Sequence, residues 1–221
     1  MLTFAEEILL LNLDDERGVI KSLPRISIET AIAAASLMEL TFLRKIDAGV
    51  DKIYVVDTAP LHIGDTLSDA VLKILALEKE EKPIRYWLNV ITERIPNLVE
   101  QVLDSLVAKK VLKMENQRIL WFFEKRRYPM NNDEQIVEVK QRLRQIIENR
   151  EIPDPRDIVL ISLTRACRLF PEIFTYEERE KHLEFIDKIA KFDFVGQALS
   201  KTLRDIEQTV CLMNEAIYQY T

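Results

Sequence analysis

The sequence of 221 residues contains only four glycines, two cysteines and two histidines. So few glycines count against a Gly-rich phosphate-binding loop and favour long helices joined by short connections. Cys167 and Cys211 lie in helix-like segments and form no recognisable metal spacing with the histidines. Reduced thiols are therefore expected rather than a disulfide framework. We expect neither a metal site nor a cofactor.

Long apolar runs are also missing from the sequence. No segment approaches the roughly 20 apolar residues that a membrane-spanning helix needs. Near the N-terminus, Glu6 and Glu7 stand where a signal peptide would need basic residues. These absences predict a soluble, cytoplasmic protein that contacts a membrane only peripherally, on its cytosolic face.

The residues that are present favour helices. Hydrophobic residues make up 48% of the chain and charged residues 31%, enough for a sizeable core and a solvated surface. Thr3 and Glu6 form a capping-box pattern that starts a first helix. Further helices are predicted at residues 28–44, 65–78, 84–94, 96–109, 134–148, 154–170, 176–191 and 195–220, with short β segments near 46 and 53–56. The sequence predicts one mainly α domain spanning residues 1–221.

An apolar run next to a basic cluster is the most informative stretch. The run is Ile119, Leu120, Trp121, Phe122 and Phe123, and the nearest cations are Arg118, Lys125, Arg126 and Arg127. From Lys109 to Arg127 there are seven basic and two acidic residues, a local charge of +5 in a chain of net charge −6. Aromatic side chains favour the membrane interface, and cations favour its phosphates. The pattern predicts a membrane-contacting β-hairpin with strands at 111–113 and 118–123 and a turn at 114–117.

Three surroundings would suit this hairpin: a membrane, a second subunit or the helical core. Strand alternation would bury either Ile119, Trp121 and Phe123 or Leu120 and Phe122, and leave the other set exposed. A membrane or a second subunit would have to cover that set, so a homo-oligomer formed through the hairpin is the main alternative to membrane contact. Packing of both sets in the core is the least favoured of the three.

Enzymatic and nucleic-acid functions find less support. His62 lies in a predicted loop, near Asp57 and Asp65 in the sequence but without a nucleophile. His182 lies on a predicted helix rich in charged residues, and we expect it on the solvated face of that helix. We therefore expect no catalytic residues.

A helix at 96–109 followed by a basic hairpin is similar to the end of a winged-helix module. That helix offers two acids and no base before Lys109, which would repel DNA phosphates. We expect no nucleic-acid partner.

Several short patterns, in order along the chain, resemble those of the Golgi phosphoprotein 3 family. They are LTFAEEILLL at 2–11, LMEL at 37–40, GDTL at 64–67, LVAKKVL at 106–112, RRYP at 126–129 and PDPRDIVLI at 153–161. The resemblance implies a mostly helical fold with a hydrophobic β-hairpin, and peripheral membrane binding through phosphatidylinositol 4-phosphate. Eukaryotic members are adaptors that retain glycosyltransferases in the Golgi and connect to coat proteins.

From this resemblance we expect a non-enzymatic peripheral membrane-binding adaptor. Its expected partners are anionic lipid, phosphoinositides included, and the cytosolic segments of membrane proteins. The chain begins almost directly at the domain, without the long basic N-terminal arm of the eukaryotic members. In this respect the chain resembles the compact prokaryotic branch of the family.

The family's headgroup pocket does not carry over. It uses a Trp before the second helix, an Arg on that helix and two Arg before the hairpin, and these positions here hold Pro24, Ala33, Pro96 and Val99. The charge-assisted contacts to phosphate would be missing. The nearby cations Lys21, Arg25 and Arg94 are the candidates for a cruder anion site, although three solvated surface cations are the favoured interpretation.

Overall fold

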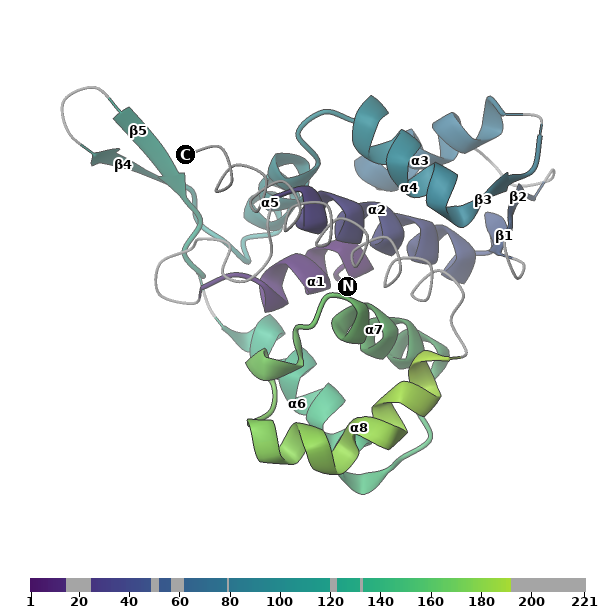
Figure 1. The fold of residues 1–221 in the computed structure, drawn as a ribbon. Coiled ribbons are helices and arrows are strands. Elements are labelled where there is room, and N and C mark those ends of the chain that lie inside the picture. The colour runs from purple at the N-terminus through teal and green to yellow at the C-terminus, as the bar shows by residue number, and fades with distance from the viewer. Residues whose placement is uncertain are drawn as a thin grey trace, which may run out of the picture.

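The computed structural model is mainly helical, with two small antiparallel sheets, which confirms the predicted fold class (Figure 1). The structure describes residues 1–14, 25–48, 52–56, 62–78, 80–119, 123–131 and 133–191. The α-helices are α1 (Phe4–Leu11), α2 (Arg25–Phe42), α3 (Thr66–Ala76), α4 (Ile84–Arg94), α5 (Leu98–Ala108), α6 (Glu134–Asn149), α7 (Pro155–Ala166) and α8 (Tyr176–Ala190). The strands are β1 (Ile46–Ala48), β2 (Lys52–Val55), β3 (Lys82–Pro83), β4 (Glu115–Ile119) and β5 (Phe123–Arg127).

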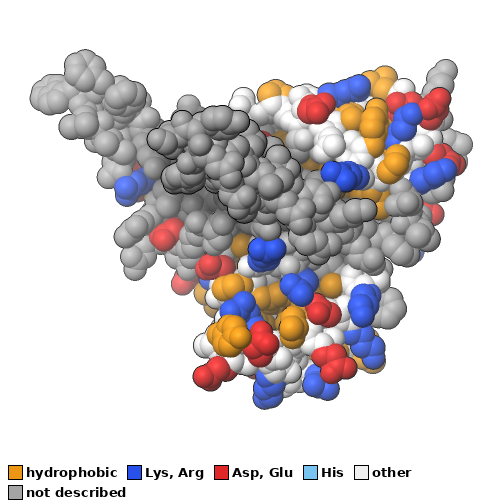
Figure 2. All heavy atoms as spheres, viewed as in Figure 1, with side chains coloured by type: hydrophobic (Ala, Val, Ile, Leu, Met, Phe, Trp, Pro, Cys, Tyr) orange, Lys and Arg blue, Asp and Glu red, His pale blue; other side chains and the backbone are white. Residues whose placement is uncertain are grey.

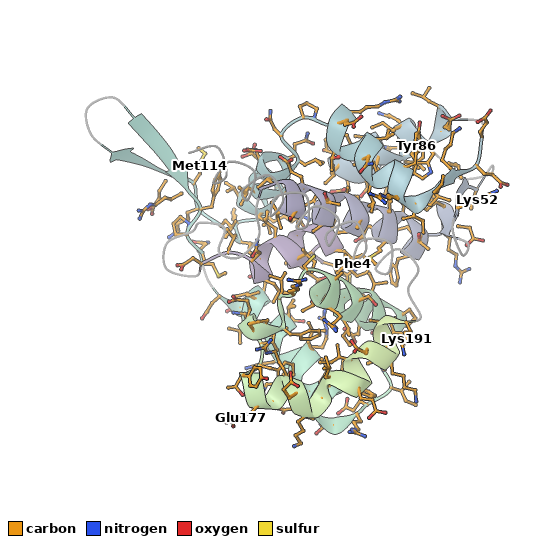
Figure 3. All side chains as sticks on the ribbon, viewed as in Figure 1. Phe4, Lys52, Tyr86, Met114, Glu177 and Lys191 are labelled. Carbon is orange, nitrogen blue, oxygen red and sulfur yellow. The ribbon has the colours of Figure 1, made fainter. Side chains whose placement is uncertain are left out.

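Helix α1 lies at the centre of the molecule, and all of its residues are buried. The predicted capping box is present, because Thr3 Oγ1 accepts from Glu6 N and Glu6 Oε2 accepts from Thr3 N at 2.7 Å. The helix contacts α2, α5, α6 and α7. Phe4, labelled in Figure 3, is fully buried on it. One short helix therefore supplies core side chains to most of the surrounding helices.

Helix α2 is the long helix of the upper group, in which it contacts α3, α4 and α5. Its alanines at positions 31, 33, 34 and 35 are all fully buried. Small side chains let neighbouring helices approach closely. Helices α6, α7 and α8 form the lower group in Figure 1, where α8 contacts both α6 and α7.

Two features of the lower group connect its helices. The second capping box, formed by Thr175 and Glu178, starts α8. Arg144 on α6 pairs with Glu178 and donates to the carbonyl of Ile173 at 2.9 Å.

The predicted helix 154–170 is shorter than expected, because α7 ends at Ala166 and a 3-10 turn follows at Phe170–Glu172. The predicted helix 195–220 lies outside the described residues.

The three-stranded sheet has the order β1-β2-β3. Strand β3 was not predicted, since its two residues look in the sequence like a helix break. Lys52 of β2 pairs in register with Pro83 of β3. A proline fits there because β3 is an edge strand, which needs no second partner for the missing N–H.

Because glycine is scarce, other residues adopt the left-handed conformation at the ends of four helices. Arg44, Lys110, Arg150 and Arg168 follow α2, α5, α6 and α7 with φ between 53° and 61°. This left-handed conformation closes many helices and is usually occupied by glycine. Here longer, cationic side chains occupy it, and a cation near a helix C-terminus complements the helix dipole.

Cys167 caps the end of α7 and is buried. Burial raises the pKa of its thiol to about 12. The thiolate is the reactive form, so this cysteine has the character of a core side chain rather than a nucleophile. Cys211 lies outside the described residues.

Candidate functional site

The β4–β5 hairpin projects away from the helices (Figure 1). Its register pairs Glu115 with Arg127 at one end and Ile119 with Phe123 at the other. The hairpin itself is confirmed, but its predicted strand limits are wrong. Residues 115–117, predicted as part of the turn, lie in β4.

The physical reason for this difference is the position of the hairpin. Apolar alternation marks a strand when one of its faces is buried in a core. A hairpin that extends away from the core can place Glu115, Asn116 and Gln117 in a strand without that signal. The first and last residues of the apolar run, Ile119 and Phe123, therefore lie on different strands and pair with each other at the end of the ladder.

Of the five predicted membrane-contact residues, two lie in the part of the chain that the structure describes. Ile119 is the last residue of β4 and Phe123 is the first of β5. Leu120, Trp121 and Phe122 lie outside the described residues, so their contact with a membrane stays a prediction.

The near end of the hairpin is anchored to the helices. The amide of Lys113 donates to the carbonyl of Pro129 at 2.9 Å, and the amide of Asn131 donates to the carbonyl of Val111 at 2.8 Å. Leu112 and Met130 form an additional β-bridge between these bonds. Val111, Leu112 and Tyr128 are buried. Figure 3 labels Met114 where the hairpin leaves this anchored region. The direction of the hairpin is thus set by packed residues.

The structure separates the cations of the basic cluster. Arg118 lies in β4, and Lys125, Arg126 and Arg127 lie in β5. Lys109, at the end of α5, donates to the carboxylate of buried Glu6 at 2.7 Å, and Ser105 Oγ donates to the same carboxylate at 2.7 Å. Lys109 therefore serves as the partner of a buried acid, although its own side chain is 38% exposed. Lys110 and Lys113 are exposed near the anchored end of the hairpin.

The candidate degenerate headgroup site stays a prediction. Arg94 is exposed at the last residue of α4, and Arg25 is the first residue of α2. Lys21 lies outside the described residues. The aligned headgroup positions are better defined, since Ala33 is fully buried and Val99 is 4% exposed. Both are apolar core residues, which gives them no means of contacting a phosphate.

One histidine prediction is wrong and the other is refined. His182 was expected on a solvated face, but it is 5% exposed and its ring lies 6.3 Å from that of Phe174. The aromatic contact with Phe174 buries it although its neighbours in sequence are charged.

His62 has an exposed side chain, and its Nδ1 lies 2.6 Å from Oδ2 of Asp69, an aspartate that the sequence analysis did not consider as its partner. That aspartate also accepts from the amide of Ile63 at 2.6 Å, so the pair orders the start of α3.

A buried ionic network around Glu7 was not foreseen from the sequence. Arg156 Nη2 donates to Glu7 Oε2 at 2.8 Å, and Arg142 Nη2 to Glu7 Oε1 at 3.4 Å. Arg142 Nε also donates to Asp157 Oδ1 at 2.8 Å. The guanidinium of Arg156 lies 4.3 Å from the ring centroid of Phe4. The network joins α1, α6 and α7, and the sequence separation of its members leaves no local pattern that would have revealed it.

Burial controls the proton affinities in this network. It raises the pKa of Glu7, and the charges of Arg156 and Arg142 offset the rise only in part. Burial raises the pKa of Asp157 in the same way, against the charge of Arg142. Burial alone would lower the pKa of Arg142, but the charges of Asp157 and Glu7 outweigh it and raise that pKa. Arg142 therefore stays charged, and burial instead raises the pKa of the two carboxyl groups.

We expect the loss of stability caused by Glu7→Gln to be smaller at about pH 7 than at about pH 4. A carboxyl group whose folded pKa is raised stabilises the fold most below its unfolded value of 4.5, and this contribution falls as the pH rises through the folded pKa. Urea unfolding of both proteins at the two pH values measures the difference.

Glu178→Gln is the matched control. A hydrogen bond from the Thr175 amide and the nearby Arg144 lower the pKa of Glu178 to about 2. Its contribution is therefore present above 4.5 and is lost as the pH falls towards 2, the opposite direction to Glu7. A Glu7→Gln difference that grows from pH 4 to pH 7 would contradict the direction assigned to Glu7.

An acid-lined hollow of about 360 Å³ lies where α1, α2, α3 and α5 meet. Its acidic lining residues are Glu6, Glu39, Asp65 and Asp104. Glu39 Oε2 accepts from the amide of Phe4 at 2.8 Å, and Asp65 Oδ2 accepts from the amide of Ser68 at 2.8 Å. With the Glu6 cap, three of the four acids serve the N-termini of α1 and α3, where negative charge is stabilising. Helix capping therefore accounts for most of the acidity of this hollow.

The described part of the chain was also compared with the requirements of a metal site and of a membrane-spanning helix. Within the described residues, no group of three or more His, Cys, Asp or Glu side chains is placed to hold a metal ion. In the same part of the chain, no helix has both the length and the apolar character needed to cross a membrane. Figure 2 shows cations and acids intermixed over the visible helical surface, without a large area of one sign among the described residues.

Comparison with known protein families gives one match. The family model described as Golgi phosphoprotein 3 (GPP34) matches residues 4–206, which is most of the chain and includes the hairpin. None of the curated proteins compared with the sequence matches it.

Proposed function

Because the chain belongs to the Golgi phosphoprotein 3 family, we propose that it is a non-enzymatic adaptor that binds the cytosolic face of an anionic membrane peripherally through its hairpin. The observation that carries this proposal is the coincidence of two features. The hairpin projects from the helices, and the last pair of its ladder joins Ile119 to Phe123, the first and last residues of the apolar run in the sequence.

The proposed mechanism has two steps. Cations along the hairpin first raise the concentration of the protein near anionic lipid, each contributing about 1 kcal/mol close to the surface. The apolar residues Ile119, Leu120, Trp121, Phe122 and Phe123 then insert to the depth of the headgroups and fix the orientation. Shallow insertion combined with a few cations gives reversible binding, as an adaptor requires.

The lipid in this proposal is anionic lipid in general. The positions aligned with the family's headgroup residues support this choice, since Ala33 and Val99 are buried apolar side chains. A negatively charged bilayer needs no stereospecific pocket, because its surface potential acts on every nearby cation. The adaptor's other partners would be the cytosolic segments of membrane proteins, as in the family.

Vesicle sedimentation tests the proposal. The full chain is mixed with phosphatidylcholine vesicles that contain or lack phosphatidylserine, at low and at high salt. We expect sedimentation with the anionic vesicles at low salt and a substantial loss at high salt, because salt screens exposed charges. No sedimentation with anionic vesicles would overturn the proposal.

Two more measurements on the same protein separate the alternatives. Binding to duplex DNA but not to vesicles would indicate the winged-helix function, although the acids Glu100 and Asp104 on α5 count against it. Concentration-dependent self-association without vesicle binding would indicate an oligomer formed through the hairpin. DNA gel shifts and sedimentation equilibrium are the measurements.

A further inference from the structure

Two of the four acids that line the acid-lined hollow have a cation nearby. Lys109 Nζ lies 2.7 Å from the carboxylate of Glu6, and Arg156 Nη1 lies 4.0 Å from Oε1 of Glu39. Both acids are buried. Opposite charges at this range attract one another more strongly where water is scarce, so each of these two cations offsets the charge of its acid.

Asp65 and Asp104 bring two further negative charges to the hollow. Asp65 Oδ2 accepts from the amide of Ser68, which carries no net charge. Asp104 is exposed on α5, and neither aspartate forms an ion pair with any residue that the structure describes. Burial raises the pKa of Glu39, and the charges of Asp65 and Glu6 add to that rise. Two acids of the hollow therefore lack a cation partner, and the others feel their charge.

A buried hydroxyl in the same hollow is a separate sign of a ligand. Ser68 is 2% exposed and lines the hollow. Its amide is bonded to Asp65, but its Oγ makes no hydrogen bond to any part of the described chain. Buried hydroxyl groups nearly always have a partner, because leaving one unpaired is costly. This hydroxyl is therefore available to a molecule that enters the hollow.

The lining indicates which kind of cation would fit. No aromatic side chain is among the residues that line the hollow, whereas quaternary ammonium ions are usually bound by aromatic cages. Within the described residues, the acids are not grouped to hold a metal ion. Carboxylates and a hydroxyl accept hydrogen bonds, which a primary ammonium group donates. The side chains of Ala5, Ala35 and Val102 also line the hollow and offer apolar contact to methylene groups.

We propose that the acid-lined hollow binds a free aliphatic diamine, which has two primary ammonium groups joined by a short methylene chain. Its two charges match Asp65 and Asp104, the two acids without a cation partner in the described chain. One ammonium group also donates to Ser68 Oγ. The volume of about 360 Å³ lies within the range of small-molecule sites. The hollow is not part of the hairpin, so this inference does not depend on the proposed membrane function.

Isothermal titration calorimetry of the full chain with 1,4-diaminobutane tests the proposal. We expect saturable binding to one site with a Kd of about 1 mM or below at low salt, and weaker binding at high salt. 1,4-Butanediol has the same chain without charge, and tetramethylammonium has charge without N–H donors. Both should bind at least about 10-fold more weakly. No saturation with 1,4-diaminobutane, or equal binding of either analogue, would overturn the proposal.

A fourth compound separates a free diamine from a lysine side chain of a partner protein. Nα-acetyl-lysine amide offers one ammonium group on a methylene chain, so it should bind about 10-fold more weakly than 1,4-diaminobutane. Binding as tight as that of the diamine would show that the hollow recognises a lysine side chain, and the free diamine would be wrong.

Three substitutions locate the binding site. Asp104→Asn removes an exposed charge, Asp65→Ser removes a charge but keeps a residue that caps helices well, and Ser68→Ala removes the hydroxyl. Each should weaken binding by about 10-fold. Glu184→Gln, the matched control, removes the same charge from an exposed site on α8 and should change the affinity by less than about 2-fold.

The variants also decide against the proposal where they behave otherwise. An equal loss with Glu184→Gln would show that only net charge matters. Unchanged binding by both aspartate variants would show that the diamine binds elsewhere. Either result would overturn the site, and unchanged binding by Ser68→Ala would overturn the role of its hydroxyl. Circular dichroism confirms that each variant is folded, and Asp104→Asn, on an exposed side chain, tests the site without disturbing a helix cap.

Discussion

Replacing Trp121 and Phe122 together by alanine is expected to lower partitioning into anionic vesicles by at least about 100-fold. Burying a large apolar side chain is worth about 1.5–3 kcal/mol, so losing two at the lower value costs about 3 kcal/mol, or about 150-fold in affinity. Aromatic residues also favour the interface itself. Vesicle sedimentation at several lipid concentrations gives the partition coefficient directly.

The control for this variant removes exposed apolar side chains elsewhere. Leu77 is 77% exposed after α3 and Tyr176 is 68% exposed at the start of α8. Leu77→Ala/Tyr176→Ala should leave partitioning unchanged, because neither residue lies on the hairpin. If the hairpin variant binds vesicles as well as wild type, insertion of the apolar end is wrong. If the hairpin variant loses self-association instead, the hairpin is an oligomer contact.

Replacing Arg156 by alanine is expected to lower the free energy of unfolding at pH 7 by about 3–5 kcal/mol. The side chain is 11% exposed and donates to Glu7 Oε2 at 2.8 Å and to the carbonyl of Leu2 at 2.6 Å. Its loss leaves buried Glu7 with the longer contact to Arg142 at 3.4 Å, and a buried charge that loses its partner is costly. The stacking of the guanidinium on Phe4 is lost as well. Urea unfolding followed by circular dichroism measures the change.

Arg165→Ala is the matched control, since it removes an arginine from the same helix. Arg165 Nε donates to Asp187 Oδ1 at 2.7 Å, but both side chains are about 40% exposed. An ion pair of this exposure contributes about 0–1 kcal/mol. Arg156→Lys should lie between the two, because lysine keeps the charge but cannot donate to two acceptors in a fixed fork. Equal losses from Arg156→Ala and Arg165→Ala would contradict the stabilising role of the buried network.

Local signals predicted the helices well. Thr3 with Glu6 marks the start of α1, and Asp65 marks the start of α3 as its N-cap. The segment predicted at 84–94 coincides with α4. These successes share a physical cause, because caps and helix periodicity act between residues three or four apart. That residues 1–221 form one domain stays a prediction.

Signals that depend on distant partners were missed or misplaced. The strand limits of the hairpin were wrong because polar residues 115–117 resemble a turn until their partners in β5 are known. His182 was placed on a solvated face because its neighbours in sequence are charged, but Phe174 packs beside it. The burial of Glu7 depends on Arg142 and Arg156, which lie more than a hundred residues away.

The sequence by itself determined that this protein is mainly helical, belongs to a recognisable family and joins an apolar run to a cluster of cations near residue 120. Composition, capping and short ordered motifs carry that information locally. Only the tertiary structure decided that one of these cations, Lys109, has a buried acid as its partner. Its ammonium group donates to the carboxylate of Glu6, which lies about a hundred residues earlier in the chain and is itself buried. The physical reason is that the field of a charge depends on its nearest neighbours in space, and folding chooses those neighbours.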